Sequence, residues 1–396
     1  MSYRFLVASY TDAIYTIEFD IATKSLKATQ KLTVGFHPSW ISRHPSDPSL
    51  VFTGLEQEDG RLLTLKYAND SGKLEVIGDV SSGGSSPCHI LVTEDQLFVA
   101  NYSSGTVGIF DIQKDSKGSS VAVKPSQAPL QFTGTGPHPR QDGSHPHQVV
   151  LYESARIPNH REVLVPDLGT DLVYRITKND KGIWEKTDEF TFEFDRGGGP
   201  RHLVVQDDKL YTLLELSNHM TAHEIASPQE IAEALKHKDE EDYDDEDAKA
   251  YHLRSSYPTF LTPHPKADPP QLAAELLSSV VDPDDTFPYS YLYVSNRNNP
   301  LPEGDIITVM NIVSPASLVT SLSIIEERPT GLKHLRGMIF FGPGEKYLIA
   351  GGQDGGGVKV FEKIRLGKDL KEIAHLPAEG EEGGMRPTGF LCYESK

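Results

Sequence analysis

Cysteine and long apolar runs are both scarce in this chain. Only Cys88 and Cys392 are present, which excludes a disulfide framework and a cysteine-based zinc site of the usual spacing. No run of 18 apolar residues occurs, and residues 1–20 alternate in polarity instead of forming a basic region followed by an apolar stretch. We therefore expect a cytoplasmic protein without a membrane-spanning segment.

Basic residues are also in deficit. The chain has 38 Lys and Arg against 57 Asp and Glu, a formal net charge of −19. A surface of this sign repels phosphate backbones and anionic lipid head groups, so neither nucleic acid nor membrane is expected as a partner. The sequence gives no indication of the oligomeric state.

A repeat runs along the chain instead. A short β-rich run that ends in a polar or small residue occurs seven times, at residues 5–10, 51–56, 97–102, 163–168, 210–215, 292–297 and 347–352. A further short strand, often led by a proline, precedes every run but the first, and one more such strand, 386–392, follows the last run. Joining this C-terminal strand to the N-terminal run completes seven equal units. The sequence therefore predicts an all-β fold, a single seven-bladed β-propeller domain over residues 1–396, closed by pairing of its N- and C-terminal strands. An irregular pair of β-sandwiches is the alternative.

The repeat is interrupted most strongly at about residues 221–290, where we expect a helix-containing acidic insertion. Ser227, Pro228 and Glu230 follow the capping-box pattern, which predicts a short helix over residues 227–238. Residues 239–247 carry eight carboxylates in nine positions and are expected to form a solvated loop.

The leading strand of each blade should line a central channel, so residues at one register position converge there. The position after the leading proline, or its equivalent, gives Ser39, Cys88, His147, Arg201, Glu275, Arg336 and Thr388. The ends of the following runs predict a second layer at the channel rim, made of Tyr10, Glu56, Tyr102, Glu215 and Arg297.

These residue types favour acid–base chemistry on a small anionic substrate. Arginine forks such as Arg201 and Arg297 suit carboxylate or phosphate. His147 titrates near neutrality and can deprotonate water or a carbon acid, and Glu215 or Glu275 can orient it or share the proton transfer. An arginine would stabilise developing oxyanion charge, which suits the opening of a lactone or its reverse.

A metal site is not expected. His138, His145 and His147 lie close in sequence, but the prolines at 137, 139 and 146 hold the chain extended, and no helical spacing brings the three imidazoles together. His145 is expected at the mouth of the channel. We therefore predict neither a bound metal nor a cofactor.

The ordered segments SHPHQVVL, VLVPDLGTDLVYRI, GGGPRHLVV, LYTLLEL, LYVSNR and RGMIFFGPGEKYLIAGG closely resemble the lactonase-type seven-bladed propeller family. That family includes bacterial propeller-type 6-phosphogluconolactonases and fungal carboxy-cis,cis-muconate cyclases. The resemblance covers nearly the whole chain and implies a catalytic set of one His, two Arg and one Glu, which falls on His147, Arg201, Arg297 and Glu215. The remaining candidates for substrate binding are Arg336, Glu275, His145, Tyr102 and Asn101.

Several functions remain open at this point. The resemblance implies either hydrolysis of a small anionic lactone, as in a 6-phosphogluconolactonase, or a muconate-type lactonising cycloisomerisation. A non-catalytic propeller scaffold is a third possibility. A calcium-dependent sugar lactonase is a fourth, with Asn101 and Glu215 as ligands, although the nearby arginines would repel a dication.

Overall fold

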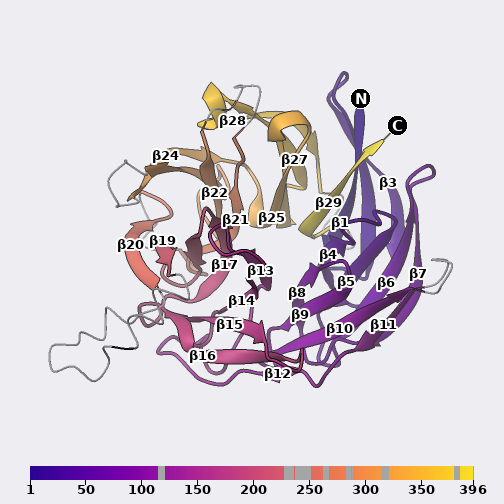
Figure 1. Cartoon of the computed structure of the whole chain (residues 1–396). Helices are drawn as coiled ribbons and strands as arrows, with labels where there is room; N and C mark the ends of the chain where they lie inside the picture. The colour runs from indigo at the N-terminus through magenta and orange to yellow at the C-terminus, as the bar shows by residue number, and fades with distance from the viewer. Residues whose placement is uncertain are drawn as a thin grey trace.

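The computed structural model describes residues 1–114, 121–226, 236, 251–261, 267–281, 287, 289–313, 321–378 and 384–395. Figure 1 shows the strands of these residues gathered into sheets that stand in a ring around an open centre. The described residues form seven sheets, each made of antiparallel neighbours. The predicted all-β, seven-bladed propeller is therefore confirmed.

Each blade starts with its innermost strand at the channel and ends with its outermost strand at the outer edge of the ring. Blade 1 is β29 (Pro387–Ser395), β1 (Ser2–Ser9), β2 (Ala13–Asp20) and β3 (Ser25–Thr33). Blade 2 is β4 (Pro38–Arg43), β5 (Leu50–Leu55), β6 (Arg61–Ala68) and β7 (Lys73–Ser81). Blade 3 is β8 (Pro87–Val92), β9 (Gln96–Asn101), β10 (Thr106–Lys114) and β11 (Val121–Pro125), with the short β12 (Leu130–Gln131) also on β10. Blade 4 is β13 (Val150–Glu153), β14 (Arg161–Asp167), β15 (Leu172–Lys178) and β16 (Trp184–Glu193).

The last three blades repeat this order. Blade 5 is β17 (Pro200–Gln206), β18 (Lys209–Leu214), β19 (His219–Ile225) and β20 (Tyr251–Pro258). Blade 6 is β21 (Leu272–Ser278), β22 (Tyr291–Arg297), β23 (Ile306–Val313) and β24 (Ser321–Pro329). Blade 7 is β25 (Lys333–Phe341), β26 (Tyr347–Gly355), β27 (Val358–Ile364) and β28 (Asp369–Leu376).

Blade 1 closes the ring with both ends of the chain. β1 pairs with β2 on one side and with the C-terminal β29 on the other, with Phe5 opposite Cys392 and Val7 opposite Phe390. The N- and C-termini accordingly lie near each other in Figure 1. The predicted closure by terminal strands is confirmed.

The core is divided among the seven interfaces between blades. The buried apolar side chains form seven clusters, and each cluster joins two adjacent blades. Between blades 7 and 1, for example, the Phe341 ring meets the Phe5 ring edge-on at 4.9 Å. Strands such as β5 are buried along their whole length because a blade packs on each face, which explains why their sequences are continuously apolar.

The region predicted as an insertion is partly regular blade structure. Residues 251–258 form β20, the outer strand of blade 5, and 272–278 form β21, the innermost strand of blade 6. The predicted helix over 227–238, apart from Lys236, and the acidic run 239–247 lie outside the described residues. The helices with described bounds are two 3-10 turns, η1 (Pro343–Glu345) and η2 (Arg365–Gly367).

A β-bulge near the start of the leading strands sets which side chains reach the channel. Strand pairing shifts between Pro38 and Trp40, between Pro87 and His89, and between Pro200 and His202. The residues left unpaired by these and the matching shifts in β25 and β29 are Ser39, Cys88, Arg201, Arg336 and Thr388. A bulge re-aims the side chains around it and breaks the simple alternation of a strand. The predicted register positions other than His147 therefore lie at bulges or other shifts in the strand register.

Candidate active site

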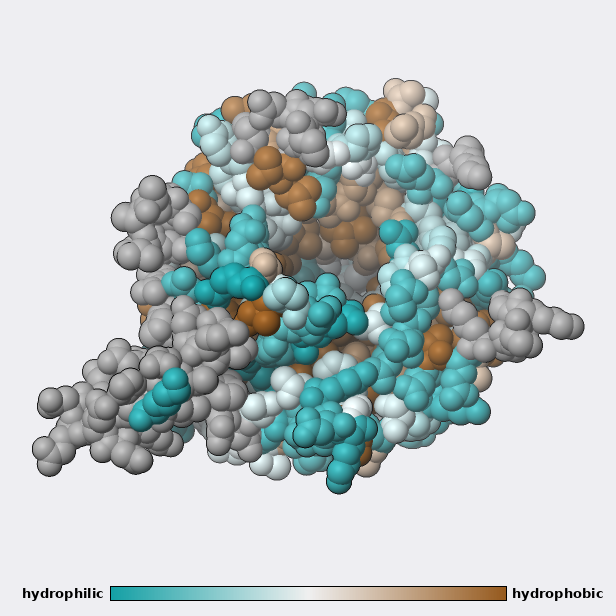
Figure 2. All heavy atoms as spheres, viewed as in Figure 1, coloured by the Kyte–Doolittle hydropathy of each residue, from teal (hydrophilic) through white to brown (hydrophobic). Residues whose placement is uncertain are grey.

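Aromatic and imidazole rings from blades across the channel meet to form a floor. The rings of Trp40 and His89 lie 4.2 Å apart, those of His89 and His202 6.1 Å, and those of Trp40 and His202 5.9 Å. The His147 ring lies 5.3 Å from that of His202. We call Trp40, His89, His147 and His202 the channel floor. Figure 2 shows that the molecule is hollowed at the centre of the ring on the face in view.

Three guanidinium groups surround one buried carboxylate in the channel wall. Glu215, which directly follows β18, is 1% exposed. Its Oε1 lies 2.9 Å from an Nη of Arg297 and is also bound by Arg140, while its Oε2 lies 2.7 Å from Nε of Arg201. The Arg201 N–H does not point at that oxygen, so this last contact is an ion pair without hydrogen-bond geometry. Three positive charges against one negative charge leave this group, which we call the guanidinium cluster, with a net charge of about +2.

Glu215 is held ionised by these neighbours. Burial alone would raise its pKa, but the charges of Arg297, Arg201 and Arg140 hold the pKa far below its usual value. Burial also lowers the pKa of Arg297 to about 10, despite the attraction of Glu215. Because Glu215 keeps its charge throughout the neutral range, it fixes the guanidinium groups in place and does not carry protons. Of the two carboxylates proposed from the sequence to share proton transfer, this one is unsuited to it.

His147 stands beside this cluster as a neutral imidazole without a partner. It precedes β13, where its backbone N–H donates to the Pro166 carbonyl at 2.9 Å. The residue is 6% exposed, its Nδ1 is buried without a hydrogen-bond partner, and the described residues offer no partner for Nε2. Burial, then the positive charge of Arg201, holds its pKa well below the usual value. A neutral imidazole with an unused nitrogen can accept a proton, and a bound anion that offsets the guanidinium charge would favour the imidazolium that then forms.

A second imidazole of the floor has a carboxylate partner. His202 Nδ1 lies 2.6 Å from Oε1 of Glu275, and both side chains are buried. Burial lowers the pKa of His202, while the Glu275 charge opposes that change. A carboxylate on Nδ1 fixes the orientation of the ring, as in the histidine–carboxylate pairs of hydrolases. Glu275 therefore orients His202, and its charge also acts on Arg201, the neighbour of His202 in β17.

The opposite wall of the channel carries a mixed polar group. The Tyr10 hydroxyl donates to Oε1 of Glu56, and the Arg336 guanidinium lies 4.8 Å over the Tyr10 ring. Arg336 also approaches Oε1 of Gln353 at 3.4 Å. Although burial alone would lower the pKa of Arg336, the proximity of Tyr10 and Glu56 raises it. Arg336 therefore keeps its charge but is already engaged by protein groups.

Two of the predicted substrate-binding residues use their polar atoms within the protein. His145 stacks on Tyr102, and its two ring nitrogens contact the Tyr102 carbonyl and the Asp142 carboxylate, each at 2.9 Å. Asn101 is fully buried, where its amide bonds to Ser82 and to the Val99 carbonyl. Tyr102 does face the cluster, because its hydroxyl lies 3.5 Å from an Nη of Arg140. His145 thus positions Tyr102.

Arg140 and three members of the channel floor, Trp40, His89 and His202, were not predicted from the sequence. Arg140 lies in the long connection between β12 and β13, outside the repeat, so no register argument could place it. His202 follows a predicted channel residue directly and would point away from the channel in an unbroken strand. The bulge between Pro200 and His202 brings it inward. In the sequence, the two consecutive polar residues Arg201 and His202 after Pro200 were the signal that could have indicated this arrangement.

Unsatisfied polar atoms gather in the channel wall. Six buried atoms of the predicted channel residues have no hydrogen-bond partner among the described residues: Ser39 Oγ, Glu56 Oε2, His147 Nδ1, Arg201 Nε, Glu215 Oε2 and Arg297 Nε. Buried polar groups are normally satisfied, and exceptions gather where a ligand or water completes them. The channel wall is thus built to surround a polar molecule.

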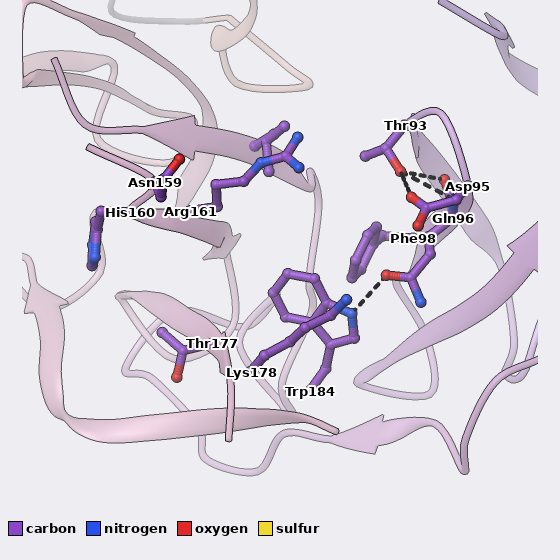
Figure 3. A pocket seen from close by; sticks show the side chains of 11 residues that line it. Thr93, Asp95, Gln96, Phe98, Asn159, His160, Arg161, Thr177, Lys178 and Trp184 are labelled. Carbon is purple, nitrogen blue, oxygen red and sulfur yellow. Dashed lines mark hydrogen bonds between the residues drawn. The ribbon is translucent and has the colours of Figure 1, made fainter. Parts of the chain in front are cut away.

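A separate cavity of about 410 Å³ lies between blades 3 and 4, at the hairpin turns that face away from the leading prolines. Figure 3 shows Lys178 beside the Trp184 indole, whose N–H donates to Gln96 at 2.9 Å. Arg161, also in this wall, is paired with Glu153 at 2.8 Å. The cavity contains none of the predicted site residues, and these polar groups already have partners, so we place the active site in the channel.

The family described as "Lactonase, 7-bladed beta-propeller" matches residues 4–380. The chain belongs to this family. Among curated proteins it is 31% identical over 228 residues to the 6-phosphogluconolactonase of Bacillus subtilis, covering 55% of this chain and 61% of the relative. It is 32% identical over 229 residues to a probable 6-phosphogluconolactonase of Arthroderma benhamiae, covering 54% of each. The chain thus spans between half and two thirds of the length of these curated relatives.

Solved structures of low sequence identity share the fold over nearly their full length. A periplasmic gluconolactonase of Pseudomonas aeruginosa superimposes with a TM-score of 0.74 at 21% identity, covering 100% of both chains. A putative 6-phosphogluconolactonase of Bacteroides fragilis gives 0.73 at 20% identity, with 99% and 98% covered. At these identities the likeness supports the fold alone.

The described part of the chain contains neither a metal-ligand cluster nor a membrane-spanning helix. No three His, Cys, Asp or Glu side chains among its residues are arranged to hold a metal ion. No helix within it has the length and apolar character needed to cross a membrane.

Proposed function

We propose that this protein hydrolyses a small anionic lactone in its central channel, as the names of its curated relatives suggest. The observation that carries the proposal is the neutral, unpartnered imidazole of His147 beside the guanidinium cluster of Arg140, Arg201 and Arg297. Membership of the lactonase family supports it.

The chemistry assigns one role to each part of the site. The net positive charge of the guanidinium cluster draws in the phosphate or carboxylate of the substrate. His147 accepts a proton from a water molecule as that water attacks the lactone carbonyl. The nearby guanidinium charge stabilises the oxyanion that forms. The alkoxide released by ring opening then takes a proton from the His147 imidazolium.

The test is an assay of acid release from 6-phosphogluconolactone and gluconolactone above the uncatalysed rate. Replacing His147 with Gln keeps a side chain of similar size but removes the base, so kcat should fall by about 100- to 10,000-fold. The control is His375→Gln, which changes an exposed histidine of blade 7 far from the channel and should leave kcat unchanged. An unchanged kcat in His147→Gln would refute the proposed base.

The same panel separates the alternatives. Turnover of carboxymuconates, followed by their ultraviolet absorbance, with no lactone hydrolysis would assign the channel to cycloisomerisation. No turnover on either substrate class, together with a stable stoichiometric protein partner, would favour a scaffold.

A further inference from the structure

The wall of the channel that lies opposite the guanidinium cluster contains an unused hydrogen-bond acceptor. Glu56 follows β5, and its backbone N–H donates to the His37 carbonyl at 2.9 Å. Its side-chain Oε1 accepts the Tyr10 hydroxyl, whereas its Oε2 is buried and has no hydrogen-bond partner among the described residues. The buried hydroxyl of Ser39, at the bulge in the same blade, is likewise unpartnered there.

The Glu56 carboxyl reaches into the channel itself. It contacts Tyr10 of blade 1, and it acts electrostatically on Arg336 of blade 7 and on Cys88 of blade 3. Burial raises the pKa of the Cys88 thiol, and Glu56 raises it further. These residues come from three other blades, and the innermost strands that carry Cys88 and Arg336 bound the channel, so the Glu56 carboxyl must lie there.

The charges of the two walls differ, so each wall favours a different chemical group of a bound substrate. The wall around Glu215 carries three guanidinium groups against one carboxylate. The guanidinium groups on the Glu56 side are already engaged, because Arg336 is held over the Tyr10 ring and Arg386 is paired with Asp354 at 2.7 Å. A carboxylate oxygen accepts hydrogen bonds and donates none, so the partner that satisfies Oε2 of Glu56 must be a donor, and a second anionic group would be repelled there.

We propose that Glu56 is a specificity-determining residue that accepts a hydrogen bond from a hydroxyl of the substrate, with the Ser39 hydroxyl of the same blade as a second polar contact. The channel then selects a hydroxylated lactone with one anionic end over an unsaturated diacid. This inference rests on the proposed function for the identity of the substrate-binding channel. It adds the residues that recognise the end of the substrate remote from the guanidinium cluster.

Binding measurements test it independently of turnover. The probes are glucitol 6-phosphate and hexyl phosphate, which have the same chain length and the same single anionic group but differ in five hydroxyls. Calorimetry on the full chain should show the hydroxylated phosphate binding about 10- to 100-fold more tightly to the wild type, because the analogue leaves the Glu56 carboxylate unpaired. Glu56→Gln should reduce this preference by about 10-fold or more. Glu58→Gln, which changes an exposed carboxyl two residues away, should retain it.

A second variant keeps the test interpretable if Glu56→Gln fails to fold. Tyr10→Phe leaves the Glu56 carboxylate in place and removes only the hydroxyl on Oε1, so the preference should persist. A preference that survives intact in folded Glu56→Gln, or that disappears in Tyr10→Phe, overturns the role of Glu56 while leaving lactone hydrolysis standing. If the wild type binds muconate more tightly than glucitol 6-phosphate, the inference is also overturned. Absence of binding of either phosphorylated probe to the wild type would instead refute the proposed function, and the inference with it.

Discussion

Replacing Glu215 with glutamine removes the carboxylate that Arg140, Arg201 and Arg297 share. The local charge then rises from about +2 to about +3 in a site where Arg201 is 2% exposed and Arg297 5% exposed. Removing one partner of a buried ion pair costs about 3 to 5 kcal/mol, because the remaining charge stays desolvated. With an unfolding entropy of about 2.1 cal/mol/K per residue, this corresponds to a fall in Tm of roughly 4 to 6 °C for a chain of this length.

The pH dependence of this effect has a definite sign. The pKa of Glu215 is depressed in the folded state, so its contribution is fully present above the unfolded-state pKa of about 4.3 and is lost only as pH falls through the depressed value. The stability difference between wild type and Glu215→Gln should therefore be constant from about pH 6 to pH 8 and shrink at strongly acidic pH.

Urea unfolding and scanning calorimetry measure both quantities. The matched control is Glu18→Gln, because Glu18 pairs with Arg4 at 2.9 Å but is 29% exposed at its side chain. A solvent-screened pair of that kind is worth about 1 kcal/mol or less. If Glu215→Gln lost no more stability than Glu18→Gln, the buried cluster would not be held together by its carboxylate, and the electrostatic account of the site would be wrong.

Arg140 permits a sharper version of this test. Its side chain is 41% exposed, so Arg140→Gln alone should change stability by about 1 kcal/mol or less. In that background Glu215→Gln restores the original net charge of the cluster, and its cost should fall by about 1 to 2 kcal/mol. Strict additivity of the two substitutions would contradict the shared-carboxylate arrangement.

Two further predictions concern the ring and its floor. A Cβ at Gly337 would lie 2.3 Å from the Thr388 carbonyl of the closing strand, so Gly337→Ala should lower the free energy of unfolding by about 1 to 3 kcal/mol in urea titrations. The control is Gly143→Ala, which should leave the stability unchanged because the space around Gly143 is open. Equal stability of the two variants would argue against the tight contact. Burial lowers the pKa of the floor histidines, so the unfolded chain binds more protons below pH 6.5 and stability should decline there by up to about 1.4 kcal/mol per pH unit for each histidine. His89→Gln should flatten that decline relative to His375→Gln, and parallel stability–pH curves for the two would contradict this assignment.

The sequence predicted the ring because each blade repeats the same pattern. A run ending in a polar residue and a leading proline mark the two ends of one hairpin, so counting them gives seven blades and the terminal closure. It also predicted that Arg201, from a leading strand, lies near Glu215 and Arg297, from the ends of the following runs, because equivalent positions of neighbouring blades lie at similar heights in the ring. The structure places Arg201 and Arg297, from blades 5 and 6, on Glu215.

Features that depend on pairing partners could not be predicted in the same way. The bulge that turns His202 inward is a property of β17 against β18, and nothing in the β17 sequence alone indicates it. Arg140 comes from a connection without a repeat. The insertion was placed too broadly because the outer strand β20 carries little apolar signal and follows the acidic run directly.

The floor and the rim of the channel differ in the kinds of side chain they contain, and this difference follows from the structure of a blade. The bulges supply Trp40, His89 and His202, and the segment before β13 supplies His147, so that rings from four neighbouring blades meet in the channel. The rim supplies charge from the ends of the second strands, Glu56 and Glu215 among them, and from loops such as the one that carries Arg140. Loops vary without disturbing the strands, whereas a change in the floor moves several blades at once. Under the proposed function, substitutions at the rim should therefore alter selectivity among lactones, whereas substitutions of His147 and its neighbours in the floor should alter the rate of proton transfer.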